Sequence, residues 1–265
     1  MSTIRLAATV ILARPPFEVY LLRRSASSAF APDAFVFPGG TIEPQDWSPQ
    51  AHARTLGLER ERLEGEFRAT IPPDLACDEP TVDLAAAATL CVTAIRELFE
   101  EAGVLLARTR WGRPIDAAAD WQRIVVERAE VRHARLSFAD FLARHDWYGD
   151  AEALTLFSHW ITPRTEPRRY NTHFFFAAAP ADQPALADAV ETHDGLWIAP
   201  SEALARRRRG DLHLVYPTIN HLVRLQSFAS VEAAREFARN KAVLTIMPQE
   251  AGDGFHIPDG IENAW

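Results

Sequence analysis

A long alanine-rich stretch that ends in a cluster of acids constrains this chain more than any other part of its sequence. Residues 84–102 are rich in Ala, Leu and Glu, which favour a helix, and Asp83 is of a residue type that caps helix N-termini. Gly103 follows directly, at the position where a left-handed cap commonly ends a helix. The sequence therefore predicts one rigid helix over residues 84–102 with acidic residues in its last turns.

Three glutamates of this helix can face one point. A rotation of about 100° per residue places Glu100 about 60° from Glu97 on one side and Glu101 about 40° from it on the other. Their carboxylates repel one another and lie at the negative end of the helix dipole unless a cation sits among them. A solvated acidic face is the alternative interpretation. The spacing and the glycine stop favour a site for a hard divalent cation, Mg²⁺ or Mn²⁺.

Two segments of the chain carry a resemblance to a known family. Residues 96–104 read Arg-Glu-Leu-Phe-Glu-Glu-Ala-Gly-Val, and residues 37–46 read Phe-Pro-Gly-Gly-Thr-Ile-Glu-Pro-Gln-Asp. Together they resemble the Nudix hydrolase box, Gly-x5-Glu-x7-Arg-Glu-U-x-Glu-Glu-x-Gly-U, in which U is aliphatic. Asp46 stands in place of the first glutamate of the box, and Ala88 lies eight residues before Arg96. Forty-nine residues separate Asp46 from Arg96 where the family has seven, so an insertion splits the box.

A split box resembles the branch of peroxisomal coenzyme A diphosphatases and their bacterial relatives. The resemblance implies an α/β protein, a Nudix-type α/β/α sandwich with a mixed sheet. We expect one domain over residues 1–265, with a helical insertion at 47–83 and a helical C-terminal extension at 211–265. Apolar patterns predict strands at 4–13, 17–23, 35–37, 154–162, 172–179 and 195–198. Further helices are predicted at 51–67, 117–132, 138–145, 200–208, 217–226 and 231–240.

The implied activity is metal-dependent hydrolysis of a pyrophosphate bond in a nucleoside diphosphate linked to another moiety. Coenzyme A or acyl-CoA is the favoured substrate. The alternatives are a pyrophosphatase of ADP-ribose, dinucleotides or nucleotide sugars, and a Nudix ligand-binding module without catalysis. By resemblance, the metal ligands are the three glutamates and a backbone carbonyl at Gly39, and Arg96 orients a glutamate through a salt bridge. The general base is left open among Glu97, Glu152, Glu166 and Glu191.

Candidate substrate contacts come from two weaker motifs. The run 21–25, Leu-Leu-Arg-Arg-Ser, partly matches a signature that precedes the box in family members that hydrolyse coenzyme A, and makes Arg24 a candidate phosphate contact. Arg168 and Arg169 belong to a Pro-Arg-Arg run that is similar to one in the split-box branch, although solvated strand-end charges are the alternative.

We also expect the insertion to form a lid or wall beside the end of the substrate that does not react.

Composition narrows the partners. A net charge of −8 repels nucleic acid and anionic membranes, and no stretch reaches the roughly 18 apolar residues of a membrane-spanning helix. Cys77 and Cys91 show no zinc-binding spacing and are expected to be reduced thiols, with core packing for Cys91. The sequence thus predicts a cytoplasmic enzyme for a small nucleotide-type substrate, without nucleic-acid or membrane partners, and compatible with a homodimer.

Overall fold

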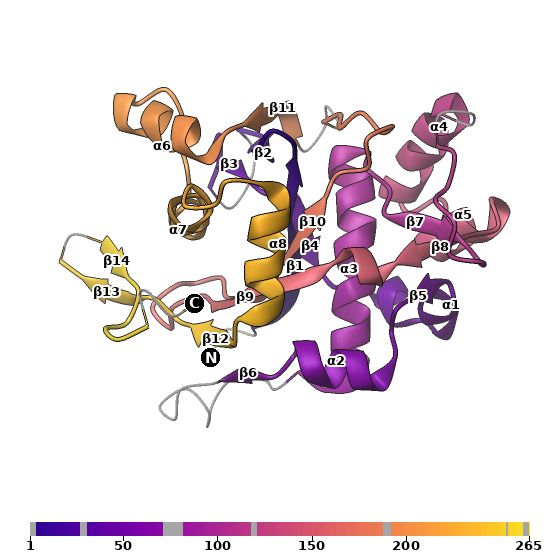
Figure 1. The fold of residues 1–265 in the computed structure, drawn as a ribbon, viewed down its shortest axis with the longest axis horizontal. Helices are drawn as coiled ribbons and strands as arrows, with labels where there is room; N and C mark the ends of the chain where they lie inside the picture. Colours follow the sequence, from indigo (N-terminus) through magenta and orange to yellow (C-terminus); the bar gives the residue numbers. More distant parts are fainter. Residues whose placement is uncertain are drawn as a thin grey trace.

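The computed structural model describes residues 4–26, 31–70, 82–117, 121–187, 192–252, 254–261 and 265 (Figure 1). Its centre is a mixed sheet in the order β11-β2-β1-β10-β9-β12-β6, with β3 paired to β2 and β4 paired to β1. β1 runs parallel to β10 and antiparallel to β2 and β4. The longer strands are β1 (Arg5–Arg14), β2 (Glu18–Arg24), β9 (Thr155–Ile161), β10 (Tyr170–Ala178) and β11 (Thr192–Ile198). The shorter ones are β3 (Phe35–Val36), β4 (Gly39–Thr41), β6 (Ala69–Thr70) and β12 (Val243–Ile246).

Helices cover both faces of this sheet, which confirms the predicted α/β/α architecture. Alternate side chains of β1 point to opposite faces, so that Val10 and Leu12 belong to one core while Ile11 and Ala13 belong to the other. The first core is closed by α3 (Leu84–Ala102), and the second by three helices of the last third of the chain (Figure 1). These three are α6 (Pro200–Arg209), α7 (Tyr216–Leu225) and α8 (Val231–Asn240).

The predicted helix over residues 84–102 has the predicted bounds. The Asp83 carboxylate accepts a hydrogen bond from the N–H of Ala86 at 2.8 Å, and Gly103 ends the helix in the left-handed region with φ 70°. Cys91 is buried in its core-facing side, as expected, and burial raises the pKa of its thiol to about 12. Cys77 lies outside the described residues. Helix α3 is therefore capped at both ends, and it packs on the sheet with its acidic residues at its C-terminal end.

A smaller layer packs beside α3. It contains a three-stranded sheet in which β8 (Trp147–Asp150) pairs with β5 (Thr55–Leu56) on one side and with β7 (Ala107–Thr109) on the other. Two helices, α4 (Trp121–Arg132) and α5 (Phe138–Arg144), and the short η2 (Ala151–Ala153) complete the layer. An aromatic cluster joins this layer to α3, since the rings of Phe99 and Phe141 stack with centroids 4.7 Å apart.

The insertion does not form the single helix predicted at 51–67. It contains η1 (Pro44–Trp47), α1 (Pro49–Ala53), β5 and α2 (Arg60–Glu66). Gly57 breaks the helical path between α1 and α2, because it takes a φ of 81° that a helix does not allow. Its remaining strand, β6, pairs in parallel with β12 of the C-terminal extension. This contact between insertion and extension supports our proposal that residues 1–265 form one domain.

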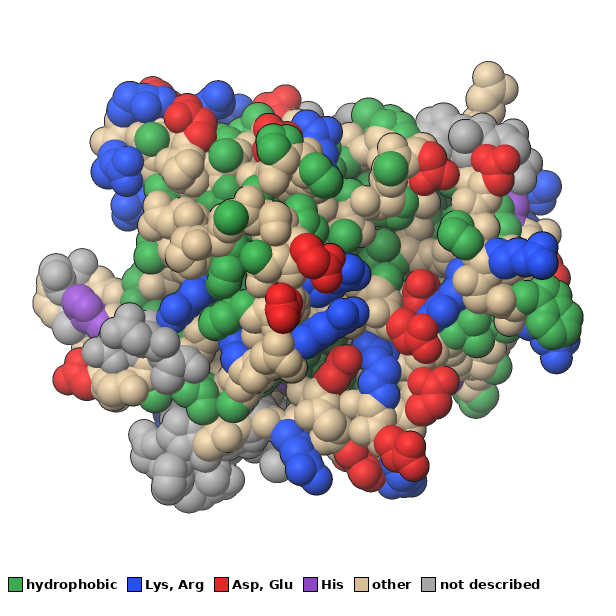
Figure 2. Space-filling view, viewed as in Figure 1, with side chains coloured by type: hydrophobic (Ala, Val, Ile, Leu, Met, Phe, Trp, Pro, Cys, Tyr) green, Lys and Arg blue, Asp and Glu red, His purple; other side chains and the backbone are tan. Residues whose placement is uncertain are grey.

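The C-terminal extension was predicted to be helical, but besides α7 and α8 it contains β12 and a hairpin of β13 (Gln249–Ala251) and β14 (Gly254–His256). β12 is a strand because it pairs with β9 and β6 in the central sheet. On the face of the molecule shown in Figure 2, basic and acidic side chains are interspersed. Ion pairs such as Arg62–Glu66 at 3.1 Å and Arg235–Glu232 at 2.6 Å are examples of this charge pattern. Among the described residues, no helix is both long and apolar enough to cross a membrane.

Candidate active site

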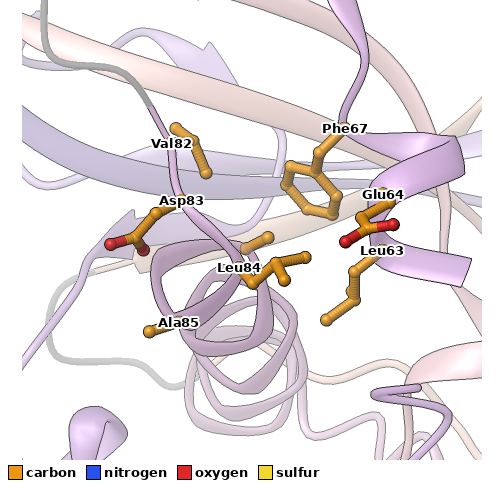
Figure 3. A pocket seen from close by; sticks show the side chains of 8 residues that line it. Leu63, Glu64, Phe67, Val82, Asp83, Leu84 and Ala85 are labelled. Carbon is orange, nitrogen blue, oxygen red and sulfur yellow. The ribbon is translucent and has the colours of Figure 1, made fainter. Parts of the chain in front are cut away.

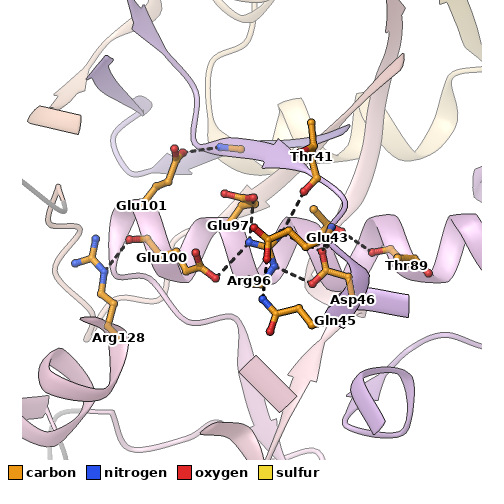
Figure 4. Close-up of polar contacts among 12 residues, drawn as sticks. Thr41, Glu43, Gln45, Asp46, Thr89, Arg96, Glu97, Glu100, Glu101 and Arg128 are labelled. Carbon is orange, nitrogen blue, oxygen red and sulfur yellow. Dashed lines mark hydrogen bonds and ion pairs between the residues drawn. The ribbon is translucent and has the colours of Figure 1, made fainter. Parts of the chain in front are cut away.

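Arg96 and Asp46 form the buried centre of the acidic cluster (Figure 4). The Arg96 guanidinium donates from Nε to Asp46 Oδ1 at 2.8 Å and from Nη2 to Asp46 Oδ2 at 2.9 Å, and both side chains are 1% exposed. Oδ2 also accepts from the hydroxyl of Thr93 at 2.8 Å and from the N–H of Glu43 at 3.0 Å. The two halves of the split box are thus joined by a bidentate ion pair across the insertion.

The same guanidinium also contacts two of the predicted metal ligands. Nη1 of Arg96 lies 3.0 Å from Glu97 Oε1 and 3.2 Å from Glu100 Oε1. Burial alone would lower the pKa of Arg96, but the carboxylates of Glu97, Asp46 and Glu100 raise it well above its usual value. Arg96 is therefore a permanent cation that fixes the direction of both glutamate side chains.

The backbone of Gly39 and Gly40 contacts two of the glutamates, Glu101 and Glu97. The N–H of Gly39 donates to Glu101 Oε2 at 2.8 Å, and Figure 4 shows the Glu101 side chain turned toward that backbone. A side chain at Gly40 would collide with the carboxylate of Glu97. Burial raises the pKa of Glu97 to about 7; Arg96 counteracts this shift, whereas Glu100 and Asp46 add to it. The backbone at Gly39 and Gly40 thus packs closely against the glutamates at the end of α3, and together they form one wall of the site.

A comparison with known families identifies this arrangement. The sequence model of the NUDT19 Nudix domain matches residues 1–225 of the chain. The chain belongs to the Nudix hydrolase family. Residues Arg96 to Val104 are the second half of the Nudix box, and Asp46 contacts Arg96 from the first half.

Individual relatives agree with this assignment. The chain is 31% identical over 252 residues to the acyl-coenzyme A diphosphatase NUDT19 of Gallus gallus, covering 86% of the chain and 66% of that protein. It is also 31% identical over 261 residues to the protein of that name from Homo sapiens, covering 87% of the chain and 67% of the human protein. The chain thus spans about two thirds of the length of these relatives. A crystal structure of a NUDIX hydrolase from Alicyclobacillus acidocaldarius superposes with a TM-score of 0.67 at 27% identity, covering 92% of this chain and 98% of that one.

Nudix hydrolases generally need divalent metal ions, and the donor set of this Nudix site fits such an ion chemically. Glu97, Glu100 and Glu101 supply carboxylate oxygens, which hard cations prefer as ligands. The three carboxyl groups can carry more negative charge than the one guanidinium beside them, that of Arg96, can neutralise. The described residues contain no ready-made group of three His, Cys, Asp or Glu side chains that could hold a metal. Two of the glutamates are instead directed at Arg96 and the third at Gly39, so that metal binding requires rotation of carboxylates within this cluster.

The predicted substrate-binding arginines lie at two different places in the sheet. Arg24 ends β2, whose neighbour β3 leads into the glycine loop. Arg169 lies at the turn between β9 and β10 and donates to the carbonyl of Thr162 at 3.0 Å, and Arg168 precedes it. Because β1 pairs Arg5 with Tyr170 and Thr9 with Gly39, this turn lies about 13 Å along the strand from the glycines. Only a substrate that spans this distance could contact both the arginine pair and the glutamates.

The alternative bases are also spread out. Glu152 pairs with Arg108 at 2.6 Å in the smaller layer, and Glu166 lies in the β9–β10 turn. Glu191 lies outside the described residues. Of the candidates that the structure describes, Glu97 is the carboxylate that lies within the cluster.

In the described part of the expected lid, α1 and α2 pack along the first half of α3. His52 of α1 contacts Thr89 at 3.0 Å, and α2 packs near the first turn of α3. Figure 3 shows the cavity between α2 and the start of α3, about 490 Å³ in volume. Leu63 and Glu64 of α2 and Phe67 directly after it line one side, and residues 82–85 and 87 line the other. From Leu84 to Glu97 the helix rises about 20 Å, so α2 lies well away from the glutamates. A role of the insertion beside the nonreacting end of the substrate stays a prediction. Residues 71–81 lie outside the described part of the chain.

Sequence reasoning missed two groups that hold the site. Thr93 completes the hydrogen bonds of Asp46, and Arg128 of α4 donates from Nε to the carbonyl of Glu100 at 3.1 Å. Thr93 lies one helical turn before Glu97, a position that the helix pattern could have indicated. Arg128 has no such signal, because only the packing of α4 on α3 brings it there.

Proposed function

We propose that the chain is a metal-dependent pyrophosphohydrolase that cleaves coenzyme A or acyl-CoA at its pyrophosphate. The observation that carries the proposal is the wall of three glutamates, Arg96 and the Gly39–Gly40 backbone, in a chain that belongs to the Nudix family. The choice of substrate rests on the relatives, which are named acyl-coenzyme A diphosphatases. It also rests on the partial signature around Arg24.

In this proposal the glutamates and the carbonyl of Gly39 would hold Mg²⁺ or Mn²⁺. A bound divalent ion would neutralise phosphate charge and lower the pKa of a water molecule. Arg96 acts as a positioning residue, because its Nη1 holds Glu97 and Glu100 while Asp46 fixes its other edge. Glu97 would orient the attacking water or accept its proton, since it is the carboxylate nearest to the Gly40 backbone.

Arg24, Arg168 and Arg169 would bind the anionic ends of the substrate away from the reacting phosphorus. Coenzyme A carries a third phosphate on its ribose, so it offers these cations a ligand that ADP-ribose lacks. The net charge of −8 also makes local basic groups necessary for any anionic substrate. We further propose a cytoplasmic location and no nucleic-acid partner, both from this charge and from the sequence.

A turnover screen tests the proposal. The purified chain is incubated with Mg²⁺ or Mn²⁺ and with coenzyme A, acetyl-CoA, a long-chain acyl-CoA, ADP-ribose, a dinucleotide or a nucleotide sugar. We expect the coenzyme A compounds to give the highest kcat/KM and to yield 3′,5′-ADP and a phosphopantetheine. Preference for ADP-ribose or a nucleotide sugar would replace the substrate but keep the chemistry. Binding without turnover of any compound would indicate a ligand-binding module.

A further inference from the structure

Backbone carbonyls at the C-terminal end of α3 accept hydrogen bonds from residues outside the helix. The last carbonyls of a helix lack partners within the helix and must find them elsewhere when they are not solvated. Here the carbonyl of Phe99 is satisfied locally, by the N–H of the cap residue Gly103 at 3.0 Å, whereas that of Ala102 accepts from the N–H of the distant Leu186 at 2.7 Å. The carbonyl of Glu100 accepts from Arg128 at 3.1 Å. The turn that carries two of the predicted metal ligands is therefore held from outside the helix.

Arg128 makes the widest of these connections. Its Nε contacts the carbonyl of Glu100, and its Nη2 donates to the carbonyl of Leu186 at 2.9 Å. Its guanidinium also lies so close to Gly103 that a Cβ there would stand 2.8 Å from Nη1. One side chain of α4 thus joins the end of α3, its glycine cap and the loop before β11.

The position is also electrostatically significant. Carbonyl oxygens give a helix a negative C-terminal end, and here the carboxylates of Glu100 and Glu101 add charge to the same turn. A guanidinium is the group that best offsets this charge while making several directed hydrogen bonds. Without it, the last turn would lose a carbonyl partner in the place where its own charges already favour fraying.

We propose that Arg128 is a positioning residue of the active site, which fixes the backbone of the last turn of α3 so that Glu100 and Glu101 stay beside Arg96 and Gly39 and only their carboxylates need to rotate to bind a metal. This inference rests on the proposed function, since it concerns the groups that would bind the metal. Arg128 acts through the backbone of Glu100 and touches neither substrate nor metal. A contact that merely adds stability is the competing interpretation.

The test compares Arg128→Gln, Arg128→Lys and the control Arg123→Gln. Arg123 lies on the same helix and pairs at 3.4 Å with Glu127 rather than with α3, and its side chain is 56% exposed. Because displacements of about 1 Å at an active site can cost about 100-fold in rate, we expect Arg128→Gln to lower kcat at least about 10-fold. KM should stay within about twofold, because the proposed substrate contacts are elsewhere. Lysine keeps the positive charge but has a single donor nitrogen, so Arg128→Lys should recover part of the lost kcat.

Hydrogen exchange supplies a readout that does not depend on turnover. In Arg128→Gln, the amides of residues 100–106 should exchange at least about 10-fold faster than in the wild type, while those in the first half of α3 stay unchanged. Wild-type kcat in Arg128→Gln, an equal loss in Arg123→Gln, or no recovery in Arg128→Lys would overturn the inference. Unchanged exchange at residues 100–106 would also overturn it. If the wild type hydrolyses none of the tested pyrophosphates, the proposed function fails, and the exchange comparison still decides whether Arg128 holds the turn.

Discussion

Replacing Asp46 by Asn tests whether the buried pair with Arg96 closes the split box. The amide keeps the size of the carboxylate but has one acceptor oxygen in place of two. With Oδ1 kept on Arg96 Nε, the Nδ2 group faces three donors, namely Nη2 of Arg96 at 2.9 Å, the hydroxyl of Thr93 at 2.8 Å and the N–H of Glu43 at 3.0 Å. Flipping the amide changes which contacts are lost but cannot restore them all.

The cost can be worked from these contacts. A hydrogen bond between neutral groups contributes about 1 kcal/mol, and one to a charged group about 2 kcal/mol. Removing one partner of a buried ion pair costs about 3–5 kcal/mol, but Arg96 keeps Glu97 and Glu100 as counter-charges. We therefore expect Asp46→Asn to lower the free energy of unfolding by about 3 kcal/mol. In a chain of this size that corresponds to a fall in Tm of about 6–12 °C.

The assay is urea unfolding of the wild type and the variant, together with kcat for the best substrate. The control is Asp150→Asn, which weakens the pair with Arg108, a 2.6 Å contact whose side chains are 22% and 17% exposed. That change should cost about 1 kcal/mol or less, because both side chains reach solvent and Arg108 keeps Glu152 as a second partner at 2.6 Å. Asp46→Asn should also lower kcat at least about 10-fold, because Arg96 would no longer be fixed beside its glutamates. A loss of stability below 1 kcal/mol for Asp46→Asn would refute the reasoning.

Three further outcomes are expected. Glu100→Gln and Glu101→Gln should each lower kcat at least about 100-fold with little change in Tm, since each removes a charge proposed to bind the metal, and near-normal kcat in both would contradict the metal site. Gly40→Ala should abolish activity and lower Tm, as measured by turnover and thermal unfolding, because its Cβ collides with the carboxylate of Glu97; wild-type activity would contradict the close approach. Burial lowers the pKa of Lys241 to about 7, and Arg224 adds to the shift. Between pH 7 and the usual pKa of a lysine, the unfolded chain therefore binds more protons at this residue than the folded chain does. The free energy of unfolding accordingly rises with pH over this range. Urea unfolding should therefore show that Lys241→Met stabilises the protein more at pH 6 than at pH 9.5, and an equal effect at both would contradict the burial of a titrating amine.

The parts of the fold that the sequence predicted are those specified by local signals. Helix α3 has the predicted bounds because its propensity, its Asp83 cap and its Gly103 stop all lie within the segment itself. Strands β1 and β9 were predicted to within about two residues, since each is an apolar run bounded by turn residues. Locally consistent segments of this kind need no knowledge of their partners.

The rest depends on partners that are distant in the sequence. Strand β6 is two residues long and pairs with β12, which lies more than 170 residues further along the chain and pairs with β9 on its other side. The predicted helix at 51–67 failed at Gly57, where one left-handed residue outweighs the helical pattern on both sides. In the candidate site, the cluster of glutamates was readable from helical spacing. Arg128 was not, because its role depends on how α4 packs on α3.

The split box poses the question of how two halves of one motif stay together across an insertion. The entropy of closing a flexible loop rises as 1.5 RT ln n, so lengthening the connection from seven to forty-nine residues costs about 1.7 kcal/mol. A bidentate buried pair between Arg96 and Asp46, supported by Thr93 and Glu43, is large enough to offset that cost. The insertion lowers the cost further by packing α1 and α2 on the first half of α3, so that little of the described connection is a free loop. The insertion therefore joins α3 at its N-terminal end, away from the glutamates. Arg96 and Asp46 hold the two halves of the box together near the glutamates, so an insertion at the N-terminal end leaves the site intact.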